Sequence, residues 1–199
     1  MRHMPDATGD RWPRFEMVTF SVPTGIPNDW DAELLAKGVP KDLLLKDYHA
    51  ANELALLTFP GGEQFVRFGT SGRDDHMCLD PRTGAVVEII KEDTDPTYQA
   101  SGVQVSPIFV NSSLDQFIAS VRAVVNRFPF YRGNPEQEQD RGQDDLADEW
   151  YRAAEDLLEI LGRIDPAATA DLDGFWATLV SDVQMGDYST KMVLSDSPW

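Results

Sequence analysis

The chain has 199 residues, and 42% of them are hydrophobic, so it is long and apolar enough to bury the core of one ordinary domain. Its 34 acidic residues against 17 basic ones give a formal net charge of −17 at pH 7. Phosphate groups and anionic membrane surfaces repel such a chain, which argues against nucleic acid and membranes as partners and favours a basic protein.

The single cysteine, Cys78, excludes an internal disulfide and is typical of a reduced, cytoplasmic protein. No stretch reaches the roughly 18 consecutive apolar residues of a membrane span, and the N-terminal residues lack the apolar region of a secretory signal. Residues 1–16, with a start rich in Pro, Asp and Gly, are predicted to form a flexible leader. Residues 17–199 are predicted to form a single domain.

The first predicted element is a short helix over residues 29–38, which Gly38 can end in a left-handed conformation before Pro40. Short apolar runs separated by turns follow, and the clearest turns are Pro60-Gly61-Gly62 and residues 80–84. The close spacing predicts an antiparallel meander, because parallel strands need longer crossovers. The predicted strands cover residues 54–59, 64–68, 76–79, 85–90 and 107–110.

Three amphipathic helices are predicted after the meander. Ser113 and Gln116 form a capping-box pattern at the start of the first helix. Trp150 lies on the apolar face of the second helix. Trp176 lies on the apolar face of the third helix, which should end near Gly186. We expect the Trp176 side chain to be buried against the sheet or the Trp150 helix. The order helix, meander, helices predicts a single α+β domain. The apolar positions of the three helices are, in chain order, Leu114, Phe117, Ile118, Val121, Val124, Val125, Phe128; Leu146, Trp150, Ala153, Ala154, Leu157, Leu158, Leu161; and Leu172, Phe175, Trp176, Leu179, Val180, Val183.

The residue types that commonly carry catalysis do not form a recognisable motif. The three histidines, His3, His49 and His76, are scattered and lack zinc-ligand spacing. The run Asp74-Asp75-His76 followed by Asp80 is able to hold a cation, but a solvated acidic turn is the favoured interpretation. Ser71, in Gly69-Thr70-Ser71-Gly72, lacks the pattern of a nucleophile elbow, so this segment is interpreted as a hairpin. We therefore predict no catalytic residue, metal or cofactor, and keep a hydrolase using Ser71 or the Asp74/Asp75 pair as a minor alternative.

An acidic run extends from Glu136 to Glu159, with ten carboxylates against two arginines. A solvated loop and the outer face of a helix explain such a run as well as a binding surface for a basic partner does. Just upstream, Tyr131 and Arg132 have the composition of interface hot spots, although core packing accounts for their aromatic neighbours equally well. The candidate partner-binding residues are Tyr131, Arg132, Glu136, Glu138, Asp140, Asp144 and Asp145.

The segment Phe109-Val110-Asn111-Ser112-Ser113-Leu114, followed by Phe117, resembles the SUKH superfamily of Smi/Knr-like proteins, and most closely its fourth subfamily. The resemblance runs from about residue 29 to residue 194. Further matching pieces occur in order along the chain: Leu35 with Gly38-Val39-Pro40, Phe68-Gly69, Cys78-Leu79-Asp80 with Gly84-Ala85-Val86-Val87, and Phe175-Trp176.

The resemblance implies a twisted antiparallel sheet of about five to six strands flanked by helices. It also implies a bacterial immunity protein that binds and neutralises a cognate polymorphic toxin, a nuclease or nucleic-acid deaminase domain with a basic surface, and that is not an enzyme. A SUKH-type scaffold or regulatory module without a dedicated toxin is the alternative. The oligomeric state and the identity of the toxin stay open at this point.

Overall fold

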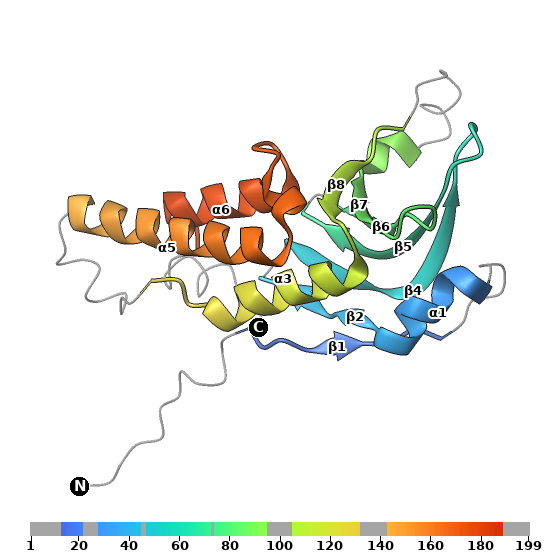
Figure 1. Ribbon diagram of the computed structural model, residues 1–199, viewed down its shortest axis with the longest axis horizontal. Coiled ribbons are helices and arrows are strands. Elements are labelled where there is room, and N and C mark those ends of the chain that lie inside the picture. The colour runs from blue at the N-terminus through green and yellow to red at the C-terminus, as the bar shows by residue number, and fades with distance from the viewer. Residues whose placement is uncertain are drawn as a thin grey trace, which may run out of the picture.

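The computed structural model describes residues 13–21, 28–44, 47–72, 74–94, 105–131 and 143–188. A curved six-stranded antiparallel sheet, in the order β3-β4-β5-β6-β7-β8, forms one half of the molecule (Figure 1). Each strand pairs with its neighbour in sequence, so the predicted meander is confirmed. The strands are β3 (Asp42–Leu43), β4 (Tyr48–Thr58), β5 (Gln64–Ser71), β6 (Asp75–Leu79), β7 (Val86–Ile89) and β8 (Ile108–Asn111).

A second, two-stranded sheet pairs β1 (Met17–Val18) with β2 (Val39–Pro40), on either side of helix α1 (Asn28–Lys37). Gly38 ends α1 with a φ of +70°, as the sequence predicts. A Cβ atom at this position would lie 2.3 Å from the carbonyl oxygen of Val18, so the approach of β1 also requires glycine. The described chain packs on the core from Phe15 onward, within the segment predicted to be a leader.

Three longer helices form the other half of the molecule: α3 (Leu114–Arg127), α5 (Gln143–Ile164) and α6 (Phe175–Met185). Ser113 caps α3 as predicted, since its Oγ accepts a hydrogen bond from the Gln116 backbone N–H at 3.2 Å. Gly186 ends α6 with a φ of +83°, also as predicted. Two short 3₁₀ helices, η1 (Lys91–Thr94) and η2 (Pro166–Thr169), lie in the connections.

The structure corrects several sequence-based expectations. Leu172 is 86% exposed and lies before α6, in a turn where the Asp171 carboxylate accepts from the Asp173 N–H, so it is not on the apolar face of that helix. Leu158 is also exposed. Residues 69–71 belong to β5, because they pair with both β4 and β6, and the turn begins only at Gly72. The short strands β1, β2 and β3 were not predicted, since two residues carry no periodic signal.

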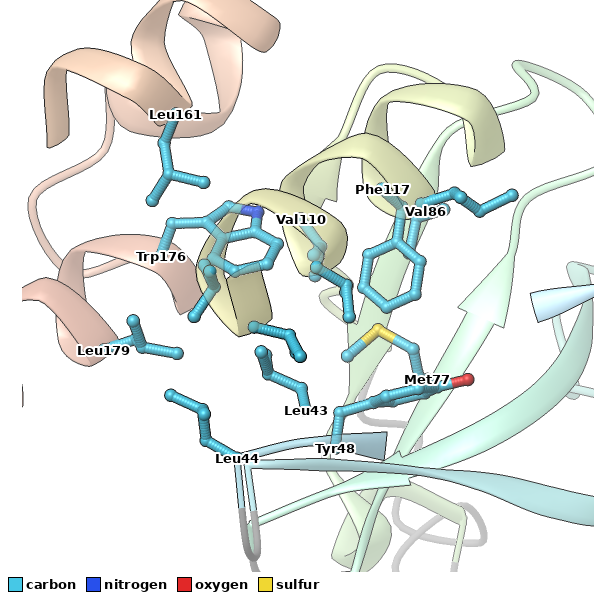
Figure 2. Packing of buried hydrophobic residues seen from close by; sticks show 14 of the residues in the cluster. Leu43, Leu44, Tyr48, Met77, Val86, Val110, Phe117, Leu161, Trp176 and Leu179 are labelled. Carbon is cyan, nitrogen blue, oxygen red and sulfur yellow. The ribbon is translucent and has the colours of Figure 1, made fainter. Parts of the chain in front are cut away.

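The main core fills the space between the helices and one face of the sheet. Trp176 is fully buried there, as predicted, and Figure 2 shows it between Leu161 and Leu179 of the helices and Val110 at the end of the sheet. Phe117 from α3 packs on Tyr48 with ring centroids 5.2 Å apart, which joins the helices to β4. A smaller second cluster contains Phe59, Phe65, Cys78, Val87 and Ile89. The fold is therefore the predicted α+β arrangement of an antiparallel sheet with helices against it.

Candidate functional site

The acidic run predicted to face a partner is only partly within the described residues. Arg132, Glu136, Glu138 and Asp140 lie outside them. Asp144 and Asp145 fall in the first turn of α5, where the description covers the backbone and not their side chains. The carboxylates that are described in full are those of Asp148, Glu149, Glu155, Asp156 and Glu159, all on α5. All carboxylates of the acidic run whose side chains the structure describes therefore lie on α5.

Tyr131 is buried rather than presented to solvent, with 3% of its surface exposed. Its hydroxyl donates a hydrogen bond to the carbonyl oxygen of Val183 in α6, and its ring lies 6.0 Å from that of Trp150 in α5. These contacts join the end of α3 to both other long helices. In this conformation Tyr131 packs in the core, so the contact with a partner proposed for it would require this corner to open.

Helix α5 has two chemically different sides. Its inner side buries Ala153, Ala154, Leu157 and Leu161 against the rest of the molecule. Its outer side carries charges and, unexpectedly for a solvated face, Tyr151 and Leu158. Two of the outer carboxylates are paired: Asp156 with Arg127 of α3, and Glu159 with Arg163 at 3.6 Å. The side-chain carboxylates of Asp148 and Glu155 make no hydrogen bond or ion pair with another residue in the described part of the chain.

A small acidic cavity of about 170 Å³ lies where the sheet meets α6. Its described wall includes four carboxylates and no basic side chain, so it would favour a cationic group over an anion. Tyr188 donates a hydrogen bond to one of these carboxylates, that of Asp47, at 2.7 Å. The lining residues are Asp47, Ser71, Gly72, Glu88, Ile108, Asp173, Phe175, Thr178, Leu179 and Asp182.

Ser71, the residue of the minor hydrolase alternative, lies in this cavity wall and is buried. Its hydroxyl donates a hydrogen bond to Glu88 on β7. Burial raises the pKa of Glu88, a shift that the Ser71 hydrogen bond opposes and the charge of Asp75 increases. None of the residues lining the cavity is a histidine, so Ser71 has no general base of the serine–histidine type there.

The three aspartates among the four residues considered as a cation site already have partners in the protein. Lys91 binds two of them, because its Nζ lies 3.1 Å from the Asp74 carboxylate and its backbone N–H donates to Asp75 at 2.8 Å. Asp80 accepts from the Arg82 side chain at 3.1 Å. Burial lowers the pKa of His76, and nearby Arg67 adds to this effect. Within the described ranges, no group of three or more His, Cys, Asp or Glu side chains is placed to hold a metal ion.

A buried polar junction connects the sheet to the helices, and Asp165 is its centre. Its carboxylate accepts from the backbone N–H of Ser112 at 2.6 Å, the Ser112 hydroxyl at 2.9 Å and the Asn111 amide at 3.1 Å. The same carboxylate caps η2 through the Ala167 N–H at 3.2 Å. Asn111 in turn accepts from Trp176 Nε1 at 3.0 Å. The helix cap at Ser113, next to this junction, was predicted from the sequence, whereas the role of Asp165 was not foreseen.

A family model described as SUKH-4 immunity protein matches residues 4–182. No curated protein and no solved structure matches the chain. Within the described residues, no helix combines the length and apolarity needed to cross a membrane.

Proposed function

Because the chain belongs to the SUKH-4 immunity protein family, we propose that it neutralises a cognate toxin by binding the toxin directly. The family match confirms the resemblance found in the sequence and spans all three long helices up to residue 182. The partner that we propose is a bacterial polymorphic toxin with a nuclease or nucleic-acid deaminase domain. The proposed place of action is the cytoplasm, and the proposed mode is inhibition by binding, with no catalytic step of its own.

The observation that carries this proposal is the acidic surface. The whole chain has a net charge of −17, and α5 alone contains seven carboxylates against two arginines. A toxin that acts on nucleic acid needs a basic surface to hold phosphates. An acidic inhibitor is therefore complementary to such a toxin, and complementary charge accelerates encounter and excludes wrong partners.

The test is the binding kinetics of the purified chain with the toxin domain encoded beside it, measured at two salt concentrations. Five carboxylates of the acidic run are changed together to amides, which removes charge and preserves size: Glu136, Glu138, Asp140, Asp144 and Asp145. We expect the association rate at low salt to fall several-fold and its salt dependence to flatten, while dissociation changes less. If the five side chains are exposed, each substitution should change stability by no more than about 0.5 kcal/mol, as for most surface substitutions.

A matched control removes the same number of carboxylates elsewhere on the chain, at Glu16, Glu53, Glu63, Asp74 and Glu92. It changes the net charge equally, so any larger effect of the first variant reports the position of the charge rather than its sum. Absence of binding between the unaltered chain and the toxin domain would refute the proposed function. Equal effects of the two variants would show that the acidic run does not face the toxin.

A further inference from the structure

Helix α5 lies on the outside of the helical layer, with its first turns extending past the end of α3 (Figure 1). Its buried side chains hold one side against the body of the protein, and the Arg127–Asp156 ion pair fixes one flank toward α3. The opposite flank carries Tyr151 and Leu158, which are 54% and 42% exposed. The body of the protein therefore does not account for these two large side chains.

These two residues share one face of the helix. They are seven positions apart, which is close to two full turns, so their side chains project in nearly the same direction about 10 Å apart along the axis. Asp148 and Glu155 are exposed on the acidic margin of the same flank, each three or four positions from Tyr151. We name these four residues, Asp148, Tyr151, Glu155 and Leu158, the outer α5 face.

The charges of the outer α5 face are available for a partner. The carboxylates of Asp156, on the flank toward α3, and of Glu159, one turn after Glu155, already have arginine partners. Those of Asp148 and Glu155 have none in the described part of the chain. An exposed tyrosine and leucine, beside carboxylates that have no ion-pair partner among the described residues, have the composition of an interface centre with a charged rim.

We propose that the outer α5 face is the surface that contacts the toxin, and that it binds a toxin surface combining an apolar depression with lysine or arginine side chains. This inference rests on the proposed function and names the surface that performs it. Tyr151 and Leu158 supply the contact area, because large side chains in desolvated positions carry most of the binding energy of an interface. Asp148 and Glu155 supply the complementary charge, and they belong to the part of the acidic run that lies on α5.

The test compares Tyr151→Ala and Leu158→Ala with Met17→Ala, a matched control. Met17 is a large apolar residue on β1, 38% exposed, and β1 lies outside the layer of long helices, beside β2 (Figure 1). We expect each α5 variant to weaken toxin binding about tenfold or more, chiefly through faster dissociation, and the control to change it less than twofold. Melting temperatures should stay close to that of the original chain, because all three side chains are exposed.

A charge-reversal variant, Glu155→Arg, keeps the test decisive if an alanine variant folds poorly. An arginine at position 155 should leave the helix intact, because arginine is a good helix former. Its positive charge would repel a basic toxin, so binding should weaken and association should slow. If the unaltered chain binds and inhibits the toxin while all α5 variants bind as tightly, this inference is overturned and the proposed function stands. If the variants instead change only self-association in size-exclusion chromatography, the face is a contact between copies of this chain and the inference is likewise overturned.

Discussion

Asp165 is expected to hold the sheet and the helices together, and its removal gives the most informative test of the fold. Four donors converge on its buried carboxylate: two from Ser112, one from Asn111 and one from Ala167. Asp165→Ala leaves all four without their acceptor. Only Asn111 among the donor residues is buried, whereas Ser112 and Ala167 are exposed and can turn to water. With about 1 kcal/mol for the buried donor left unpaired and about 0.5 kcal/mol for each of the other three hydrogen bonds, the loss sums to about 2.5 kcal/mol.

The expected effect on melting is large for a chain of this size. A loss of about 2.5 kcal/mol corresponds to a fall in melting temperature of about 5–10 °C, since each kcal/mol shifts a domain of 150–250 residues by about 2–4 °C. The matched control is Asp156→Ala, which removes an exposed carboxylate paired with Arg127. Exposed ion pairs contribute about 1 kcal/mol at most, so the control should be nearly neutral.

The pH dependence gives the same prediction an independent check. Burial raises the pKa of Asp165, but the hydrogen bonds from Ser112 and Asn111 outweigh this effect and the pKa is lowered overall. A carboxyl group with a lowered folded-state pKa stabilises the protein fully above the ordinary pKa of about 3.9 and loses this contribution as pH falls through the lower value. Urea unfolding should therefore separate the original chain from Asp165→Ala at about pH 7, with a difference that shrinks below about pH 4. A loss under about 1 kcal/mol at neutral pH, equal to that of the control, would refute the role assigned to Asp165.

Two further predictions concern the core and the cavity. Trp176→Ala should cost about 3–5 kcal/mol in chemical unfolding, because the side chain is fully buried. Trp176→Phe is the control: it keeps most of the volume, loses the hydrogen bond to Asn111 and should cost clearly less. A melting temperature of the alanine variant within two or three degrees of the original would contradict this placement. Glu88 has a raised folded-state pKa, mainly through burial, so its protonated form is favoured in the folded protein. The stability that this form contributes is fully present below the ordinary pKa of about 4.3 and is lost as pH rises through the raised value. Glu88→Gln is therefore expected to raise the urea midpoint at about pH 7 and to change it less at about pH 4, and a lower midpoint at neutral pH would argue against this assignment.

Local sequence signals predict much of this fold because they depend on neighbouring residues only. The cap at Ser113 and the glycine ends at Gly38 and Gly186 were all predicted correctly, since a cap needs only a side chain or a φ value within one turn of the helix. The apolar spacing of α3 predicted every buried apolar residue of that helix, although Ser120 is buried as well. Short strands escaped the same analysis, because β1 and β2 form by pairing with each other from either side of α1, and β3 is too short to show a periodic pattern.

The candidate site was predicted less completely, for a physical reason that Tyr131 illustrates. Aromatic residues beside arginine are typical both of interface hot spots and of the edge of a core, and composition does not distinguish the two. The packing of α5 and α6 around Tyr131 decides that it is buried. Conversely, Leu158 was predicted to be on the apolar face of α5 and is exposed, because the position of α3 and α6 determines which flank of the helix is covered.

The sequence by itself determined the family, the order of the elements, the acidic character and most helix ends. Each of these depends on composition or on residues close together in the chain. Only the tertiary structure decided that Asp165 joins β8 to η2 and α6, and that Tyr151 and Leu158 remain outside. Asp165 lies 53 residues from its donor Ser112, and no local pattern relates residues at that distance. The exposed flank of α5 is likewise defined by which neighbours pack against the helix, because the same amphipathic spacing is compatible with more than one direction of burial.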